Sequence, residues 1–365
     1  MGLQVGIVGL PNVGKSTLFN AVSAAGAEAA NYPFATIEPN VGVVAVPDPR
    51  LDHLSQLAQS ARTVSTSVEF LDIAGLVKGA SQGEGLGNQF LSHIREVDAI
   101  VHVVRCFDND DIVHVDGSVD PVRDVEVIDT ELLLKDLETI EKRTMSAAKS
   151  ARSGDKVAKY ELEVIEQLKT HMEAGRPARA LPGDEEARAV YRALGLLTAK
   201  PVLYAANVAE GDLGGPDNQH VAALRKLAEA EVAEVIVVCA EAEAQISELD
   251  PAERADFLAD LGLERSGLDQ LITAAYRLLG LITYFTAGPK ESRAWTVRAG
   301  TKAPRAAGEI HTDIERGFIR AEVISYADYA SLGSEQAVKD AGRLRVEGKE
   351  YVVADGDVIH FRFNV

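Results

Sequence analysis

One short segment near the N-terminus limits the folds open to this chain of 365 residues. Apolar residues fill Val5–Val8, the sequence Gly9-x-x-x-x-Gly14-Lys15-Ser16 follows, and a helical stretch, Ser16–Ala24, comes next. Glycines at such positions let backbone N–H groups turn toward a common centre, and the helix N-terminus adds the positive end of its dipole. A strand, a glycine-rich loop and a helix in this order form the phosphate-binding loop, or P-loop. The sequence therefore predicts an α/β nucleotide-binding domain.

Each side chain of this loop has an expected role. Lys15 brings a compact positive charge to the phosphates, and the hydroxyl of Ser16 is expected to coordinate magnesium. The residues of the loop that we expect to bind nucleotide are Asn12, Val13, Gly14, Lys15, Ser16 and Thr17.

A second carboxylate site follows the apolar run Val68–Leu71. Asp72 ends this predicted strand and is expected to hold magnesium through water, while the amide of Gly75 meets the γ-phosphate. Thr36 lies in a predicted loop between the two segments, where a switch threonine completes the magnesium shell. The predicted metal residues are Ser16, Thr36 and Asp72.

The base-recognition segment follows the apolar run Pro201–Ala206. A GTPase carries Asn-Lys-x-Asp here, whereas this chain has Asn207, Val208, Ala209 and Glu210. The longer Glu210 carboxylate does not fit the guanine edge, so the segment argues against guanine specificity. Cys239 and Ala240, after the run Val235–Val238, occupy the second base-contacting position.

The remaining patterns divide the chain into three parts. Runs rich in Val and Ile, without alternation, predict strands buried on both faces of a sheet over residues 1–128 and 199–281. Residues 129–198 contain two long amphipathic stretches joined at Ser153-Gly154-Asp155, which predict an inserted helical hairpin. Short strand signals over 282–365 predict a small, mainly antiparallel α+β module with hairpins.

Composition narrows the classes of protein further. The formal net charge of −19 argues against a general nucleic-acid binder but leaves room for a local basic patch. Two cysteines, Cys106 and Cys239, lie in apolar runs without C-x-x-C spacing, which predicts buried thiols rather than a disulfide or zinc site. No apolar run approaches the ~18 residues of a membrane span. The strand-like Leu3–Val8 has no basic region before it and no small-residue cleavage site after it, which argues against a secretory signal. We therefore expect a cytoplasmic protein without a membrane partner.

These residues together resemble the YchF/Obg-like ATPase family, a branch of the Obg group of P-loop proteins. The resemblance extends along essentially the whole chain. It is carried by Gly9–Ser16, Asn31-Tyr32-Pro33-Phe34-x-Thr36, Asp72–Ser81, Asn207-Val-Ala-Glu210, the helical insertion and the C-terminal module. The last part is similar to a TGS domain, a β-grasp fold. The expected fold is thus an Obg-type P-loop domain with an inserted helical hairpin and a C-terminal β-grasp module.

The resemblance implies ATP preferred over GTP, Mg²⁺ as cofactor, and slow hydrolysis. It also implies that Asn207, the backbone at Val208 and neighbouring groups read the adenine. Leu76 stands where signalling GTPases carry the glutamine that orients the attacking water. In the family a histidine from another loop is thought to take over this role, and the matching residue is His114. Asn12 resembles an asparagine that holds potassium in some related proteins, although it is equally compatible with no such ion.

The resemblance also implies partners. The family is associated with the 70S ribosome and its large subunit, and with stress responses. The C-terminal module is the least acidic region and is therefore our first expectation for an RNA contact. A partner-binding role for the tip of the helical hairpin stays open.

Two other functions remain compatible with the sequence. The chain could be an ordinary Obg-type GTPase if Asn-x-x-Glu tolerates guanine. It could also be a nucleotide-binding adaptor without significant turnover, because Leu76 cannot orient water.

Overall fold

A computed structural model describes residues 3–28, 40–74, 86–152 and 155–364. Contacts divide the chain into two compact units. The first contains residues 1–44 and 69–275, and the second contains residues 45–68 and 276–365. The predictions for Thr36, Gly75 and Leu76 fall outside the described residues.

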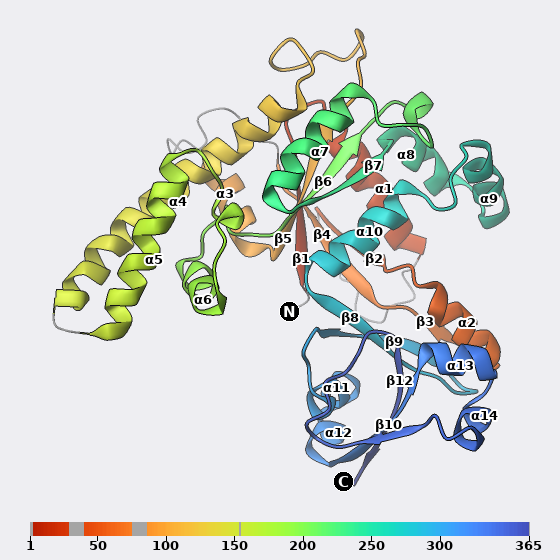
Figure 1. Ribbon diagram of the computed structural model, residues 1–365. Coiled ribbons are helices and arrows are strands. Elements are labelled where there is room, and N and C mark those ends of the chain that lie inside the picture. The colour runs from red at the N-terminus through yellow and green to blue at the C-terminus, as the bar shows by residue number, and fades with distance from the viewer. Residues whose placement is uncertain (1–2, 29–39, 75–85, 153–154, 365) are drawn as a thin grey trace. The chain divides into compact units, whose positions relative to one another are not determined.

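The first unit is built on a six-stranded sheet in the order β2-β4-β1-β5-β6-β7 (Figure 1). The pairings from β4 through β1, β5 and β6 to β7 are all parallel. Every residue of β5 and β6 is buried, as expected for strands covered on both faces. The strands are β1 (Gln4–Val8), β2 (Val41–Ala45), β4 (Ser67–Asp72), β5 (Ala99–Arg105), β6 (Val202–Asn207) and β7 (Glu234–Val238).

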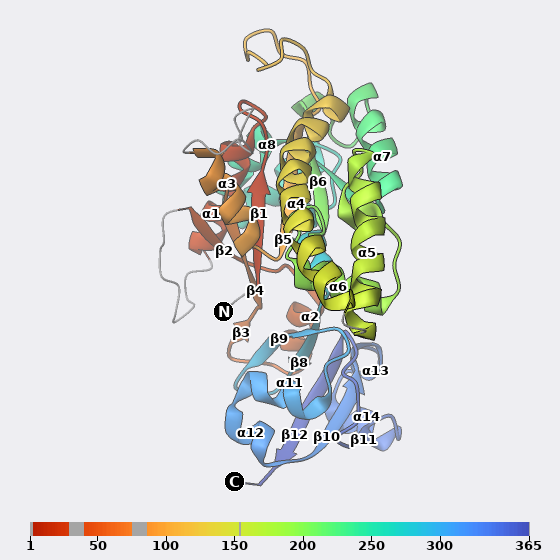
Figure 2. The same ribbon diagram turned by 90° about the vertical axis from the view of Figure 1, so that its left-hand side faces the viewer.

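Helices cover both faces of this sheet, and α1 and α7 lie on opposite sides of it (Figure 2). α1 packs beside α8, and α4 packs beside α7. Outside the hairpin, the helical segments of this unit are α1 (Lys15–Glu28), α3 (Leu86–Glu96), η2 (Ala178–Ala180), α6 (Glu185–Leu194), η3 (Glu210–Asp212), α7 (Gln219–Glu231), α8 (Ala240–Glu248), α9 (Pro251–Asp260) and α10 (Gly267–Leu278).

The predicted helical hairpin consists of α4 (Pro121–Arg152) and α5 (Lys156–Glu173), which run side by side away from the sheet (Figure 1). Its core joins one apolar face of each helix. The contributing buried residues include Leu133, Ile140, Ala147, Val164, Ile165 and Leu168. α4 begins eight residues before the predicted Asp129, because Pro121 suits the first turn of a helix, where its missing N–H costs no hydrogen bond.

Buried charges tie the base of the hairpin to the sheet domain. The Arg179 guanidinium lies 2.6 Å from Asp129 Oδ2 on α4 and 2.8 Å from Glu231 Oε2 on α7. Nearby, the buried Asp136 carboxylate accepts hydrogen bonds from the backbone N–H groups of Leu197 and Thr198, both at 2.8 Å. These bonds satisfy polar groups that would be costly to bury alone, and they fix the direction in which α4 leaves the sheet.

The second unit has a mixed sheet in the order β11-β10-β12-β8-β9-β3. Its strands are β3 (Thr63–Val64), β8 (Leu281–Thr286), β9 (Ser292–Arg298), β10 (Phe318–Ser325), β11 (Arg345–Glu347) and β12 (Asp357–Phe363). Its helices are α2 (Pro49–Leu57), α11 (Ala303–Ile310), α12 (Thr312–Arg316), α13 (Tyr326–Leu332) and α14 (Glu335–Asp340).

Three details of this unit differ from the sequence-based expectation. The hairpins expected around the turns at residues 346–349 and 355–357 do not form, because β11 and β12 both pair with β10. Val352 forms an isolated bridge with Lys302 instead of opening a strand. Residues 45–68, which we had placed in the nucleotide-binding domain, belong to the second unit because β3 pairs with β9. No helix among the described residues is long and apolar enough to span a membrane.

Candidate nucleotide site

The predicted P-loop lies between β1 and α1, at the edge where the parallel strands end. Asn12 and Gly14 both have left-handed backbone conformations, with φ of 63° and 91°. A Cβ on Gly14 would lie 2.2 Å from Asn207 Nδ2, so this glycine is required both by its φ and by the space it leaves. α1 begins directly afterwards, at Lys15, which places the helix N-terminus at the loop.

Asp72 ends β4 beside the P-loop, and the Lys15 ammonium forms an ion pair with its carboxylate. Both side chains are largely shielded from solvent. The structure thus brings together two residues predicted from separate motifs, 57 positions apart in the chain. Ser16 and Thr17 are exposed in the first turn of α1.

The donor set suits magnesium. A hydroxyl at Ser16 and a carboxylate at Asp72 are hard oxygen ligands of the kind that Mg²⁺ takes beside phosphate groups. The pairing of Asp72 with Lys15 provides local charge balance, and bound phosphates would offer Lys15 an alternative partner.

The base-recognition segment joins the P-loop through one side chain. Asn207, the last residue of β6, is buried. Its Nδ2 donates to the carbonyl oxygen of Val13 at 2.8 Å, and its Oδ1 accepts from the backbone N–H of Ala240 at 2.9 Å. Asn207 therefore braces the P-loop against the start of α8, a structural role that the motif alone did not reveal.

Other predicted base-site residues surround this brace. The N–H of Val208 already donates to the carbonyl oxygen of Val238, at 2.8 Å. Glu210 is exposed at the start of η3, and Cys239 is buried immediately before α8.

Both cysteines of the chain are free and buried, as predicted, and burial raises the pKa of Cys106 to about 12.

A loop after β5 carries His114, and Arg105 organises it from within. The buried Arg105 guanidinium donates to three backbone carbonyl groups, those of Phe107, Asn109 and Ile112, at 2.9–3.1 Å. It also stacks over the Phe107 ring, 4.6 Å from the ring centroid. The side-chain amide of Asn12 donates to the carbonyl oxygen of Val113 at 3.1 Å, so the P-loop contacts this loop next to the histidine.

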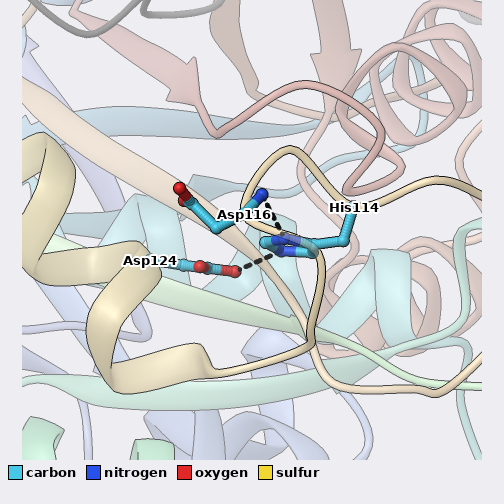
Figure 3. A group of neighbouring side chains, drawn as sticks. All are labelled: His114, Asp116 and Asp124. Carbon is cyan, nitrogen blue, oxygen red and sulfur yellow. Dashed lines mark hydrogen bonds and ion pairs between the residues drawn. The ribbon is translucent and has the colours of Figure 1, made fainter.

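His114 is buried and hydrogen-bonded at both ring nitrogens (Figure 3). Nδ1 accepts from the backbone N–H of Asp116 at 3.1 Å, which places the proton of the neutral ring on Nε2. Nε2 in turn lies 2.8 Å from Oδ2 of the buried Asp124 on α4. Its neighbours Val113 and Val115 are exposed instead. Asp124 is a partner that sequence analysis missed.

His114, Asp116 and Asp124 form the one group of potential metal ligands found in the described part of the chain. The Arg123 guanidinium already lies 3.0 Å from Asp124 Oδ1. The Arg123 guanidinium supplies the positive charge that a metal would bring. We therefore interpret the cluster as a group of side chains that holds the His114 ring in place, rather than as a metal site.

The brace predicts the effect of Asn207→Asp. The carboxylate cannot donate to the Val13 carbonyl oxygen, and two oxygen atoms would then face each other. We expect ADP affinity to fall by about tenfold, because a lost buried hydrogen bond costs about 1–3 kcal/mol. Isothermal titration with ADP measures this change. Gln219→Glu, an exposed amide-to-acid change on α7, is the control and should bind as the wild type; equal affinity for all three proteins would contradict the brace.

A buried acid on α8 predicts a pH effect on stability. Glu243 Oε1 accepts from the backbone N–H of Gly267 at 2.7 Å, and burial raises the pKa of Glu243 from 4.5 to about 7. The unfolded chain therefore releases this proton at lower pH than the folded chain, and stability falls as pH rises between these two values. Glu243→Gln removes the titrating carboxyl group and should therefore remove this pH-dependent loss of stability. The loss that the variant avoids is on the order of 3 kcal/mol in the free energy of unfolding.

Urea denaturation at several pH values tests this. The gain of Glu243→Gln over the wild type should grow from pH 4.5 to 7. The control, Glu241→Gln, changes an exposed acid on the same helix. A gain that does not change with pH would contradict the interpretation.

Comparisons with known proteins show the family of this chain. A model described as a 50S ribosome-binding GTPase matches residues 4–148, and a YchF-type C-terminal domain, described as a protein of unknown function, matches residues 281–364. The chain is 58% identical to the ribosome-binding ATPase YchF of Bacillus subtilis and 56% identical to that of Escherichia coli O157:H7, over the full length of both chains in each case.

More distant relatives extend the same match. The Obg-like ATPase 1 of Oryza sativa is 47% identical over the whole of this chain and 92% of its own length. The solved structure of the Schizosaccharomyces pombe YchF GTPase superposes with a TM-score of 0.89 at 40% identity, covering 99% of this chain and 98% of the other. The predicted fold class, a P-loop domain followed by a YchF C-terminal domain, is confirmed, and the chain belongs to the YchF family.

Proposed function

We propose that this chain is a ribosome-associated ATPase of the cytoplasm that uses ATP binding and slow hydrolysis as a switch. The observation that carries the proposal is the meeting of Lys15, Asp72 and the Asn207-braced loop at one edge of the sheet. Relatives of equal length named ribosome-binding ATPase support the same function. Stress response as its setting, the 70S particle and large subunit as its docking sites, and the TGS identity of the second unit remain predictions from the resemblance.

In this proposal ATP takes Lys15 away from Asp72. The phosphates would accept from the backbone N–H groups of Val13 and Gly14 and from the Lys15 ammonium. The Ser16 hydroxyl, and the freed Asp72 carboxylate through water, would hold Mg²⁺. Magnesium supplies charge neutralisation of the phosphates. Thr36 and the Gly75 amide complete this arrangement as predictions from their motifs, and potassium at Asn12 stays a prediction too.

The proposed preference for adenine depends on the polar groups that surround the expected position of the base. Both polar atoms of the Asn207 carboxamide, and the N–H of Val208, already bond to protein. The Asn207 side chain, expected from the resemblance to read adenine, is thus occupied in the structure. In this proposal the base instead meets the Val208 carbonyl group, Glu210, and the segment at Cys239 and Ala240. A carbonyl acceptor matches the amino group of adenine, whereas the Asp that reads guanine in GTPases is absent.

GTP hydrolysis is the second candidate function, because the matched N-terminal model and the Schizosaccharomyces pombe structure both carry GTPase in their names. The two functions differ in kcat/KM. We expect ATP to be the better substrate, and a higher value for GTP would favour the second candidate.

We place His114 in the hydrolytic step as the group that orients the attacking water. To act, its ring must first leave the Asp124 carboxylate, to which it is bonded. The contact between Asn12 and the Val113 carbonyl group gives the P-loop a direct connection to this loop. A ligand that alters the P-loop would thereby change how firmly the histidine is held.

His114→Ala should leave ATP affinity within about twofold and lower kcat by about a hundredfold, the usual contribution of a positioned proton-transfer group. Hydrolysis of ATP and GTP is measured with and without ribosomes. Val115→Ala, an exposed neighbour in the same loop, is the matched control. An unchanged kcat in His114→Ala would remove the histidine from the mechanism, and absence of turnover in the wild type under all conditions would leave only a nucleotide-binding adaptor.

A further inference from the structure

Basic residues gather at the far end of the helical hairpin. Residues 142–152 and 155–160, which we call the hairpin tip, contain six basic side chains and one acidic side chain, in a chain whose net charge is −19. The basic residues are Lys142, Arg143, Lys149, Arg152, Lys156 and Lys159. The net charge of the rest of the chain is therefore more negative than the −19 of the whole chain.

The charge changes sign along the hairpin. The proximal part of α4, residues 121–141, carries seven acidic and two basic side chains, and residues 161–173 of α5 carry four acidic and one basic. The positive charge is therefore specific to the tip, because the other parts of both helices have an excess of acidic residues. At 1.5 Å per residue, the 32 residues of α4 separate its two ends by about 48 Å, several Debye lengths at physiological salt.

The basic side chains of the tip are available to a partner. All six are exposed. Arg143 pairs with Glu161 at 2.6 Å, whereas no carboxylate in the described residues pairs with Lys149, Arg152, Lys156 or Lys159. The single acid, Asp155, caps α5 by accepting from the N–H of Val157 at 2.9 Å.

The tip also presents apolar groups and a hollow. Met145 and Val157 are 72% and 76% exposed among the basic residues. A depression on the hairpin has three basic side chains and one acidic side chain in its lining, which consists of Glu141, Thr144, Met145, Ala148, Lys149, Arg152 and Lys169. Cations that reach phosphates, next to apolar groups that pack against sugars and bases, are the elements of a nucleic-acid contact.

We propose that the hairpin tip is the surface by which this chain binds the phosphate backbone of RNA. Charge complementarity selects the occupant, because a polyanion gains from every unpaired cation at the tip and is repelled by residues 1–141 and 161–281, which carry the negative net charge of the chain. The contact therefore depends on salt. The identity of the RNA as ribosomal rests on the proposed function, but the surface itself does not. An RNA contact through the C-terminal module stays a separate prediction from the resemblance.

The test compares two quadruple variants with equal charge changes. K149Q/R152Q/K156Q/K159Q neutralises the tip, and K290Q/R298Q/R343Q/K349Q neutralises four exposed residues of the second unit. Binding to a fluorescent 20-base-pair RNA duplex and to purified ribosomal subunits is measured across a range of salt concentrations. The tip variant should bind RNA at least about tenfold more weakly, with a salt slope smaller by roughly 3, since each lost phosphate contact lowers the slope by about 1. The control should stay within about twofold of the wild type.

Three results would overturn the proposal: wild-type RNA affinity in the tip variant, equal losses in both variants, or a loss confined to ribosomes with unchanged duplex binding. The last would assign the tip to a ribosomal protein. ADP affinity and thermal melting of both variants establish that they are folded. If the wild type binds the duplex but no ribosomal particle, the proposed ribosome association fails while the tip remains an RNA-binding surface.

Discussion

Two hydrogen bonds from one buried carboxamide hold the nucleotide site together. Asn207 donates to the carbonyl oxygen of Val13 in the P-loop and accepts from the N–H of Ala240 at the start of α8. Gly14 leaves the space for this side chain, and its positive φ turns the loop toward α1. Strand ends that would otherwise be joined only by the sheet are thus fixed to one another at the point where a nucleotide has to fit.

The reactive side chains of the site are held by protein partners in the structure. Lys15 pairs with Asp72, and the His114 ring lies between Asp124 and the Asp116 amide. Both arrangements satisfy groups that are largely or fully buried, and breaking either one costs free energy that a ligand must offset. Phosphate charge provides that compensation for Lys15. In the proposed mechanism the His114 ring must also be released from Asp124, and this further cost would slow turnover.

Local sequence signals predicted much of this structure. The strand, glycine loop and helix at the N-terminus, the carboxylate at Asp72 and the apolar faces of α4 and α5 all follow from residue types at short spacing. Pro121 marks the beginning of α4, a signal that was present but not used. Features that depend on distant partners were missed. Neither the pairing of β3 with β9 nor the contact of His114 with Asp124 leaves a periodic pattern in the sequence.

The central claim is a phosphate cradle beside a base site that suits adenine. It is tested most directly by equilibrium titration of the purified protein with ADP and with GDP, in the presence of Mg²⁺. The account predicts that ADP binds at least about tenfold more tightly than GDP, since a site built for one set of polar groups leaves them unpaired with the other base. Tight binding of GDP with no measurable binding of ADP would contradict it.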